Sequence, residues 1–252
     1  MRYLMLLLAV LAGPARAVAE RQPLAVAAAA NLKPALDELV QAFQASRPEA
    51  TVRVTYGASG AFFAQIRSGA PLDLFFSADR EYPQKLVEAG LAQGEVVYAI
   101  GRLAVWVPAR SRLDLERRGL AALADPAVRK VALANPALAP YGRAAEAALR
   151  AAGVLDAVRP KLVLGTSVAQ AAQFALTGAA DAALLPRSLA SAPELAAAGR
   201  SVPVPDALSA PIEQSAVVLG AAHAPALARD LLAFVRGAEG RRILARHGYA
   251  LP

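Results

Sequence analysis

YGASGAFFAQIRSGAPLDLFFSAD, at residues 56–79, is the stretch that decides the fold. An alternating β-like run at residues 51–55 passes directly into a helix-like run at residues 61–68, and a short apolar strand follows at residues 74–76. The junction between the first strand and the helix is Gly57-Ala58-Ser59-Gly60, whose glycines allow a tight turn. Strands and helices that alternate at this spacing are typical of an α/β protein.

The same alternation continues along the chain. We predict further strands and helices from the hydrophobic periodicity. The strands are expected at 24–28, 103–107, 131–133, 162–164, 182–185 and 215–219, and the helices at 34–45, 82–89, 142–152, 168–177, 225–236 and 240–247. Two α/β units of about a hundred residues each fit this pattern. Ligands of such folds bind outside the carboxyl ends of the strands, where loops enter helices.

Four of these strand-to-helix junctions share one chemistry. They are Ala29-Ala30-Asn31-Leu32, Ala58-Ser59-Gly60, Pro140-Tyr141-Gly142 and Gly165-Thr166-Ser167-Val168. Each offers unpaired N–H groups and the positive end of a helix dipole, with small, hydroxyl or amide residues and no charge. This favours an oxyanion held by neutral donors. Ordinary capping, with Asn31 as an N-cap, is the alternative for any one junction.

Composition excludes several classes of partner. The formal net charge is +7, but the basic clusters Arg117-Arg118 and Arg241-Arg242 are short and lack interleaved aromatic residues. We therefore expect no nucleic-acid partner. The chain has no cysteine, which excludes thiolate metal ligands, a cysteine nucleophile and lipid attachment through an N-terminal cysteine.

Residues 1–19 are typical of a secretory signal peptide. Arg2 precedes an apolar run at residues 4–12, and cleavage is expected after Ala19, or alternatively after Ala17. A membrane anchor would need about 20 apolar residues, and this run breaks at Gly13-Pro14. We predict an exported, soluble, monomeric protein of the bacterial periplasm.

A hydrolase is the alternative from another class. The junction at Ser59 resembles the G-x-S-x-G nucleophile elbow, but its second glycine falls one residue early. A nucleophilic serine also needs a base, and the chain has only His223 and His247, both in or beside the C-terminal helices. A carrier of metal cations would need a denser cluster of ligands than Asp73, Asp79 and Glu81, and Asp79 is expected to cap the following helix.

Over essentially the whole mature chain the sequence resembles the periplasmic molybdate-binding proteins, the substrate-binding subunits of molybdate ABC transporters. The most specific stretch is residues 56–79, with the serine junction, a Q-I-x-x-G-A-P turn and an S-A-D strand end. AAAANL (27–32), NPALAPYGRAAEAAL (135–149) and PKLVLGTSVAQA (160–171) match the other three junctions in order.

The resemblance implies a two-lobed α/β fold, the type II periplasmic-binding-protein fold, with two chain crossings at a hinge. Lobe one would contain residues 20–98 and 210–252, and lobe two residues 99–209. The hinge would lie near residues 99–101 and 209–211. The partner would be the membrane permease of an ABC transporter, and the protein would be neither an enzyme nor a cofactor carrier.

The resemblance also implies a ligand site for molybdate or tungstate between the lobes. Its ligand residues would be Asn31, Ser59, Tyr141 and Val168, supported by Ala30, Ala58, Gly60, Gly142 and Ser167. The first three would donate from their side chains, and Asn31, Ser59 and Val168 from backbone N–H groups. Some relatives bring a tyrosine from the strand after the fourth helix, where this chain has Pro186, so Tyr141 is expected to supply the phenol. A different oxyanion, such as sulfate, stays open as an alternative.

Overall fold

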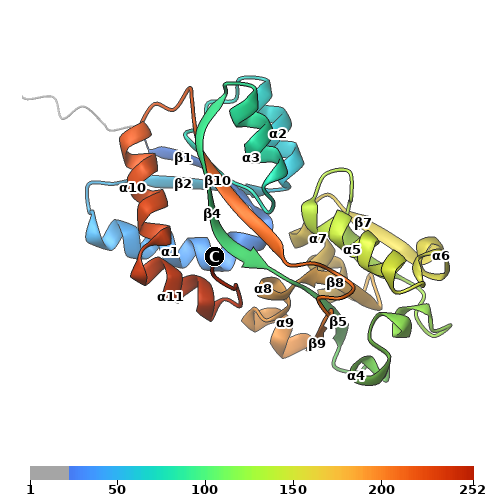
Figure 1. Cartoon of the computed structure of the whole chain (residues 1–252). Coiled ribbons are helices and arrows are strands. Elements are labelled where there is room, and N and C mark those ends of the chain that lie inside the picture. Colours follow the sequence, from blue (N-terminus) through green and yellow to red (C-terminus); the bar gives the residue numbers. More distant parts are fainter. Residues whose placement is uncertain (1–22) are drawn as a thin grey trace, which may run out of the picture.

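Two separate five-stranded sheets form the centres of two lobes (Figure 1). The structure, a computed structural model, describes residues 23–252, and the predicted signal peptide lies outside them. The strands of lobe one follow the order β2-β1-β3-β10-β4 and those of lobe two the order β7-β6-β8-β5-β9. In each sheet the first three strands are parallel and the last two are antiparallel to their neighbours. The two lobes therefore share one topology.

Lobe one is a sheet covered by helices on both faces. The alternation of β1 explains this, because Val26 and Ala28 pack into one core while Ala27 packs into the other. Helices α1, α10 and α11 cover the first face, and α2 and α3 cover the second (Figure 1). The elements are β1 (Leu24–Ala29), η1 (Ala30–Leu32), α1 (Lys33–Ser46), β2 (Val52–Gly57), α2 (Ser59–Arg67), β3 (Leu74–Phe76), α3 (Glu81–Glu88), β4 (Ala92–Gly101), β10 (Ile212–Leu219), α10 (Pro225–Arg236) and α11 (Ala238–Arg246).

Lobe two is built around a single continuous apolar core. Three of its strands, β5, β6 and β8, are apolar and almost completely buried, as expected for strands covered on both faces. The elements are β5 (Leu103–Pro108), α4 (Leu115–Arg118), η2 (Gly119–Ala124), β6 (Val131–Ala134), α5 (Pro140–Ala151), α6 (Leu155–Val158), η3 (Arg159–Lys161), β7 (Leu162–Gly165), α7 (Val168–Leu176), β8 (Ala182–Pro186), α8 (Arg187–Ala190), α9 (Pro193–Ala198) and β9 (Gly199–Pro203).

The chain passes between the lobes twice. It leaves lobe one at the end of β4 and returns between β9 and β10, after which α10 and α11 pack on lobe one (Figure 1). The predicted boundary between residues 98 and 99 lies inside β4, which continues to Gly101. The predicted two-lobed α/β fold is confirmed.

Two strands were not predicted. β4 and β9 lie at the edges of their sheets, and each pairs with one strand that is distant in the sequence. The first half of β4 is largely polar, and β9 is bounded by a glycine and a proline, so neither has an apolar strand pattern.

Within residues 23–252 no helix is long and apolar enough to span a membrane. The same residues contain no cluster of His, Cys, Asp or Glu that could hold a metal ion.

Candidate functional site

The four predicted junctions meet in one small pocket between the lobes. They follow β1 and β2 in lobe one and β6 and β7 in lobe two, so each brings the start of a helix to the pocket. The pocket is small, because the centre of a water-sized sphere can occupy only about 10 Å³ of it. Its lining residues are all uncharged: Ala29, Ala30, Asn31, Gly57, Ala58, Ser59, Ala78, Ala139, Pro140, Tyr141 and Val168. Six of the predicted site residues are among them, namely Ala30, Asn31, Ala58, Ser59, Tyr141 and Val168.

Ser59 is the first residue of α2, and only 1% of its surface is exposed. Its hydroxyl oxygen accepts a hydrogen bond of 3.0 Å from the N–H of Ala78. Within residues 23–252 its own proton has no acceptor, so the hydroxyl is free to donate into the pocket. The N–H of Ser59 belongs to the first turn of α2, where the helix itself provides no acceptor. Ser59 therefore offers two donors.

Tyr141 is placed in the same way from lobe two. It lies in the first turn of α5 and is 2% exposed. Its hydroxyl oxygen accepts a hydrogen bond of 2.9 Å from Nε2 of Gln214, a residue of β10. No acceptor for the phenol proton lies within the described part of the chain. Burial raises the pKa of Tyr141 well above its ordinary value, so the phenol remains a neutral donor.

Asn31 does not cap a helix, so the predicted N-cap role is wrong. It lies in η1, and the N-cap of α1 is Leu32. Nδ2 of Asn31 donates instead to Oε1 of Gln214 at 2.8 Å and to the hydroxyl of Tyr249 at 2.9 Å. Oδ1 of Asn31 is buried and has no hydrogen-bond partner among residues 23–252. Both amide protons are thus already donated within the protein, and the backbone N–H remains as the donor that Asn31 offers a ligand.

At the fourth junction Val168 lines the pocket and Ser167 does not. Val168 is the first residue of α7, so its N–H also lacks an acceptor within the helix. The hydroxyl of Ser167 accepts the N–H of Gln170 at 3.3 Å, which is ordinary helix capping. Pro186 ends β8 and is buried.

Gly60 and Gly142, which were predicted to support the site, do not line the pocket. A Cβ atom at Gly60 would lie 2.8 Å from the carbonyl oxygen of Leu138, and one at Gly142 would overlap the carbonyl of Ala134. Gly60 and Leu138 belong to different lobes, and the N–H of Gly60 donates to that carbonyl at 2.9 Å. Glycine at these positions therefore lets the junctions approach closely.

Gln214 and Tyr249 were missed by the sequence analysis. Both come from the part of the chain that returns to lobe one, and both contact Asn31. Gln214 is completely buried in β10, two residues before the apolar run at residues 216–219. A glutamine beside such an apolar run was the available signal, but the predicted strand began one residue after it. Tyr249 follows α11, and no local pattern marks it.

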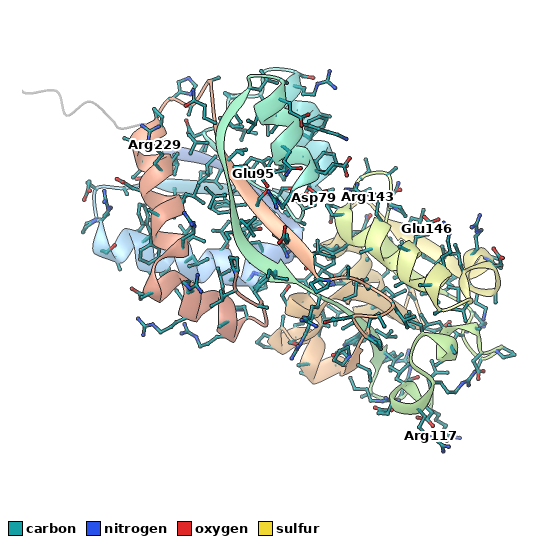
Figure 2. All side chains as sticks on the ribbon, in the orientation of Figure 1. Asp79, Glu95, Arg117, Arg143, Glu146 and Arg229 are labelled. Carbon is teal, nitrogen blue, oxygen red and sulfur yellow. The ribbon has the colours of Figure 1, made fainter. Side chains whose placement is uncertain are left out.

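The lobes are closed over the pocket. The guanidinium of Arg143, on α5 of lobe two, bonds the carboxylates of Asp79 at 2.6 Å and Glu81 at 3.2 Å and the hydroxyl of Tyr82 at 3.0 Å, all in lobe one. Figure 2 shows Arg143 and Asp79 facing each other where the lobes meet. Oδ1 of Asp79 also accepts the N–H of Tyr82, as expected of a residue that caps α3. Burial raises the pKa of Asp79, and hydrogen bonds from Ser77 and Tyr82 and the charge of Arg143 oppose the shift.

Ser59 has no base beside it in the described residues. Its hydrogen-bond partner is a backbone N–H, which cannot accept a proton. Nε2 of His247 lies 2.8 Å from a carboxylate oxygen of Glu38, and His223 is largely exposed beside Asp73. The constellation that a serine nucleophile requires is absent from residues 23–252.

The chain forms two α/β lobes joined by two crossings, and an uncharged pocket lies between them at helix N-termini. These features define a two-lobed binding protein of the type II class. Residues 24–250 match the family described as bacterial extracellular solute-binding protein. The chain is 36% identical to the molybdate-binding protein ModA of Rhodobacter capsulatus over 244 residues, which cover 96% of this chain and 93% of that protein. It therefore belongs to the bacterial extracellular solute-binding proteins and, within them, to the family of this molybdate-binding protein.

Two solved structures agree with this assignment. The periplasmic molybdate-binding protein of Azotobacter vinelandii superposes with a TM-score of 0.82 at 32% identity, covering 91% of this chain and 99% of that chain. The sulfate-binding protein SubI of Mycobacterium tuberculosis superposes with a TM-score of 0.75 at 19% identity, covering 92% and 87%. The second likeness shows the fold alone.

Proposed function

We propose that this protein binds molybdate, and similarly tungstate, between its two lobes and delivers it to the membrane permease of an ABC transporter. One observation carries the proposal. Ser59 and Tyr141 each accept a hydrogen bond from the protein, which leaves the proton of each hydroxyl for a ligand. Backbone N–H groups of Asn31, Ser59 and Val168 complete a set of neutral donors around the small pocket. The identified relatives, which are molybdate-binding proteins by name, support the choice of ligand.

The donor set is suited to a buried dianion. Burying charge is expensive unless it is hydrogen-bonded, and each bond to a charged group contributes about 1.5–3 kcal/mol. The helix N-termini add their positive partial charge. No charged residue lines the pocket, so the anion leaves without the separation of an ion pair. Reversible capture is what a transport protein requires, and we assign the protein no catalytic step.

Selectivity would follow from the size of the pocket. Sulfate has the charge and shape of molybdate but is smaller, so donors held at the larger spacing make long, weak bonds to it. The cross-lobe contacts of Gly60 with Leu138 and of Arg143 with Asp79 hold that spacing.

We assign residues 1–19 as the signal peptide, place the mature protein in the periplasm as a monomer, and divide it into lobe one (20–98 and 210–252) and lobe two (99–209). The net charge and the absence of cysteine are compatible with a free exported protein.

Thermal unfolding with added oxyanions tests the proposed function. Molybdate and tungstate are expected to raise the unfolding temperature of the chain from residue 20 onward, because a ligand that binds only the folded state stabilises it. Sulfate and phosphate at the same concentration should produce little change. Equal shifts for sulfate and molybdate would contradict the selectivity that we propose.

Arg143→Met is expected to raise the Kd for molybdate about three- to tenfold, mainly through faster release. The variant removes the ion pairs of Arg143 between the lobes, so fewer protein contacts then hold the closed state around the anion. Stopped-flow measurement of dissociation checks the rate. Arg150→Met is the matched control, because Arg150 lies on the same helix and its ion-pair partner among residues 23–252 is Glu146 of its own lobe. Identical release rates for the two variants would rule out the cross-lobe role of Arg143.

A further inference from the structure

A continuous path of hydrogen bonds links both lobes behind the pocket. The hydroxyl of Tyr249 donates to the carbonyl oxygen of Asn31 at 2.8 Å and accepts from Nδ2 of the same residue at 2.9 Å. Nδ2 also donates to Oε1 of Gln214 at 2.8 Å. Nε2 of Gln214 then donates to the hydroxyl of Tyr141 at 2.9 Å. Gln214 lies in lobe one and Tyr141 in lobe two, so the last bond crosses between them.

The direction of every bond in this path follows from its starting point. A backbone carbonyl can only accept, so Tyr249 must give it its single proton. The oxygen of Tyr249 then accepts from Asn31, which makes the facing atom of that amide the nitrogen. The second proton of this nitrogen requires the oxygen of Gln214, and the amide nitrogen of Gln214 therefore faces Tyr141. Tyr98 does not decide this direction, because its single hydroxyl proton lies between two acceptors, the carbonyl oxygen of Ser77 at 2.9 Å and Oε1 of Gln214 at 3.1 Å.

We propose that Gln214 is a positioning residue that directs the proton of Tyr141 into the pocket and thereby selects oxyanions that carry no acid proton toward Tyr141. The inference rests on the proposed function, because it specifies the chemistry of the same site. The amide nitrogen of Gln214 donates to the phenol oxygen of Tyr141. The phenol proton therefore points away from Gln214 and toward the ligand. A fully deprotonated oxyanion such as molybdate accepts that proton. Monohydrogen phosphate binds less tightly. When its P–OH group faces Tyr141, two protons face each other and no hydrogen bond forms.

The surroundings keep this arrangement unchanged near neutral pH. Burial raises the pKa of Tyr98, Tyr141 and Tyr249 above their ordinary values, so all three phenols stay protonated. Gln214 and Asn31 do not titrate. Oδ1 of Asn31 has no hydrogen-bond partner among residues 23–252, and an unpaired buried acceptor lowers folding stability.

Gln214→Met tests the proposal without adding charge. We expect the affinity for molybdate to fall about tenfold and the ratio of molybdate to phosphate affinity to fall by a similar factor, because the phenol of Tyr141 can then rotate and accept the acid proton of phosphate. Calorimetric titration of both anions at one pH measures the ratio. Gln214→Glu should weaken molybdate binding further, by a hundredfold or so, since a carboxylate would take the phenol proton away from the pocket.

Tyr98→Phe is the matched control. It removes the hydroxyl that lies 2.9 Å from the carbonyl oxygen of Ser77 and 3.1 Å from the same Oε1 of Gln214, but it leaves the path from Tyr249 to Tyr141 intact, so the affinity ratio should stay at the wild-type value. Wild-type affinity ratios in Gln214→Met, or equal losses for both anions, would overturn the role of Gln214. A wild-type protein that binds no molybdate would instead overturn the proposed function itself.

Discussion

Gly101→Ala is expected to weaken molybdate binding by about a hundredfold although Gly101 does not line the pocket. A Cβ atom at this position would overlap the hydroxyl of Tyr141 and the amide nitrogen of Gln214. Both groups would have to move, which removes one charge-assisted bond to the anion and the bond that orients the phenol. Each is a loss of roughly 1–3 kcal/mol, and 1.4 kcal/mol corresponds to a tenfold change in affinity. Calorimetric titration measures the change.

Gly220→Ala is the control for the general effect of a new methyl group. Gly220 follows β10 of lobe one, and a Cβ atom there would lie 3.4 Å from the nearest atom, which is the carbonyl oxygen of Leu91. This variant should bind molybdate like the wild type. Wild-type affinity in Gly101→Ala would show that the phenol of Tyr141 is not a ligand donor.

Ser59→Ala is expected to weaken molybdate binding about ten- to a hundredfold. The variant removes one charge-assisted hydrogen bond to the anion and leaves the backbone N–H of residue 59 in place. It also leaves the buried N–H of Ala78 without its acceptor, so the free energy of unfolding should fall by about 1–3 kcal/mol. Affinity and stability must therefore be measured on the same samples.

Ser167→Ala separates these two effects. Ser167 also stands at a junction before a helix, but its hydroxyl caps α7 and does not line the pocket. Loss of such a cap lowers stability by about 1 kcal/mol, while molybdate affinity should stay near the wild-type value. If Ser59→Ala and Ser167→Ala behave alike in both measurements, Ser59 has no special role in the site.

The junctions could be predicted because their chemistry is local. Each combines a strand end, small residues and a helix start within a few residues, and parallel strands bring such ends to one edge of a sheet. The convergence of Ser59, Tyr141 and Val168 on one pocket follows from that geometry. The two-lobed arrangement itself was implied by the resemblance and not by periodicity, which could not show that α10 and α11 return to lobe one.

What the sequence did not reveal depends on contacts between distant segments. Gln214 orients Tyr141 across 73 residues, and Tyr249 contacts Asn31 across 218 residues. Asn31 was expected to cap α1, yet the short helix η1 comes between β1 and α1 and turns its amide toward Gln214. The edge strands β4 and β9 depend on single partners that were not apparent from their own residues.

Calorimetric titration of the chain from residue 20 onward with molybdate and with sulfate, in the same buffer, tests the central claim most directly. That claim is that a pocket of neutral donors between the lobes selects a tetrahedral oxyanion by its size. We predict one molybdate per chain, bound at least about a hundredfold more tightly than sulfate. Equal affinities for the two anions, or tight binding of sulfate alone, would contradict it.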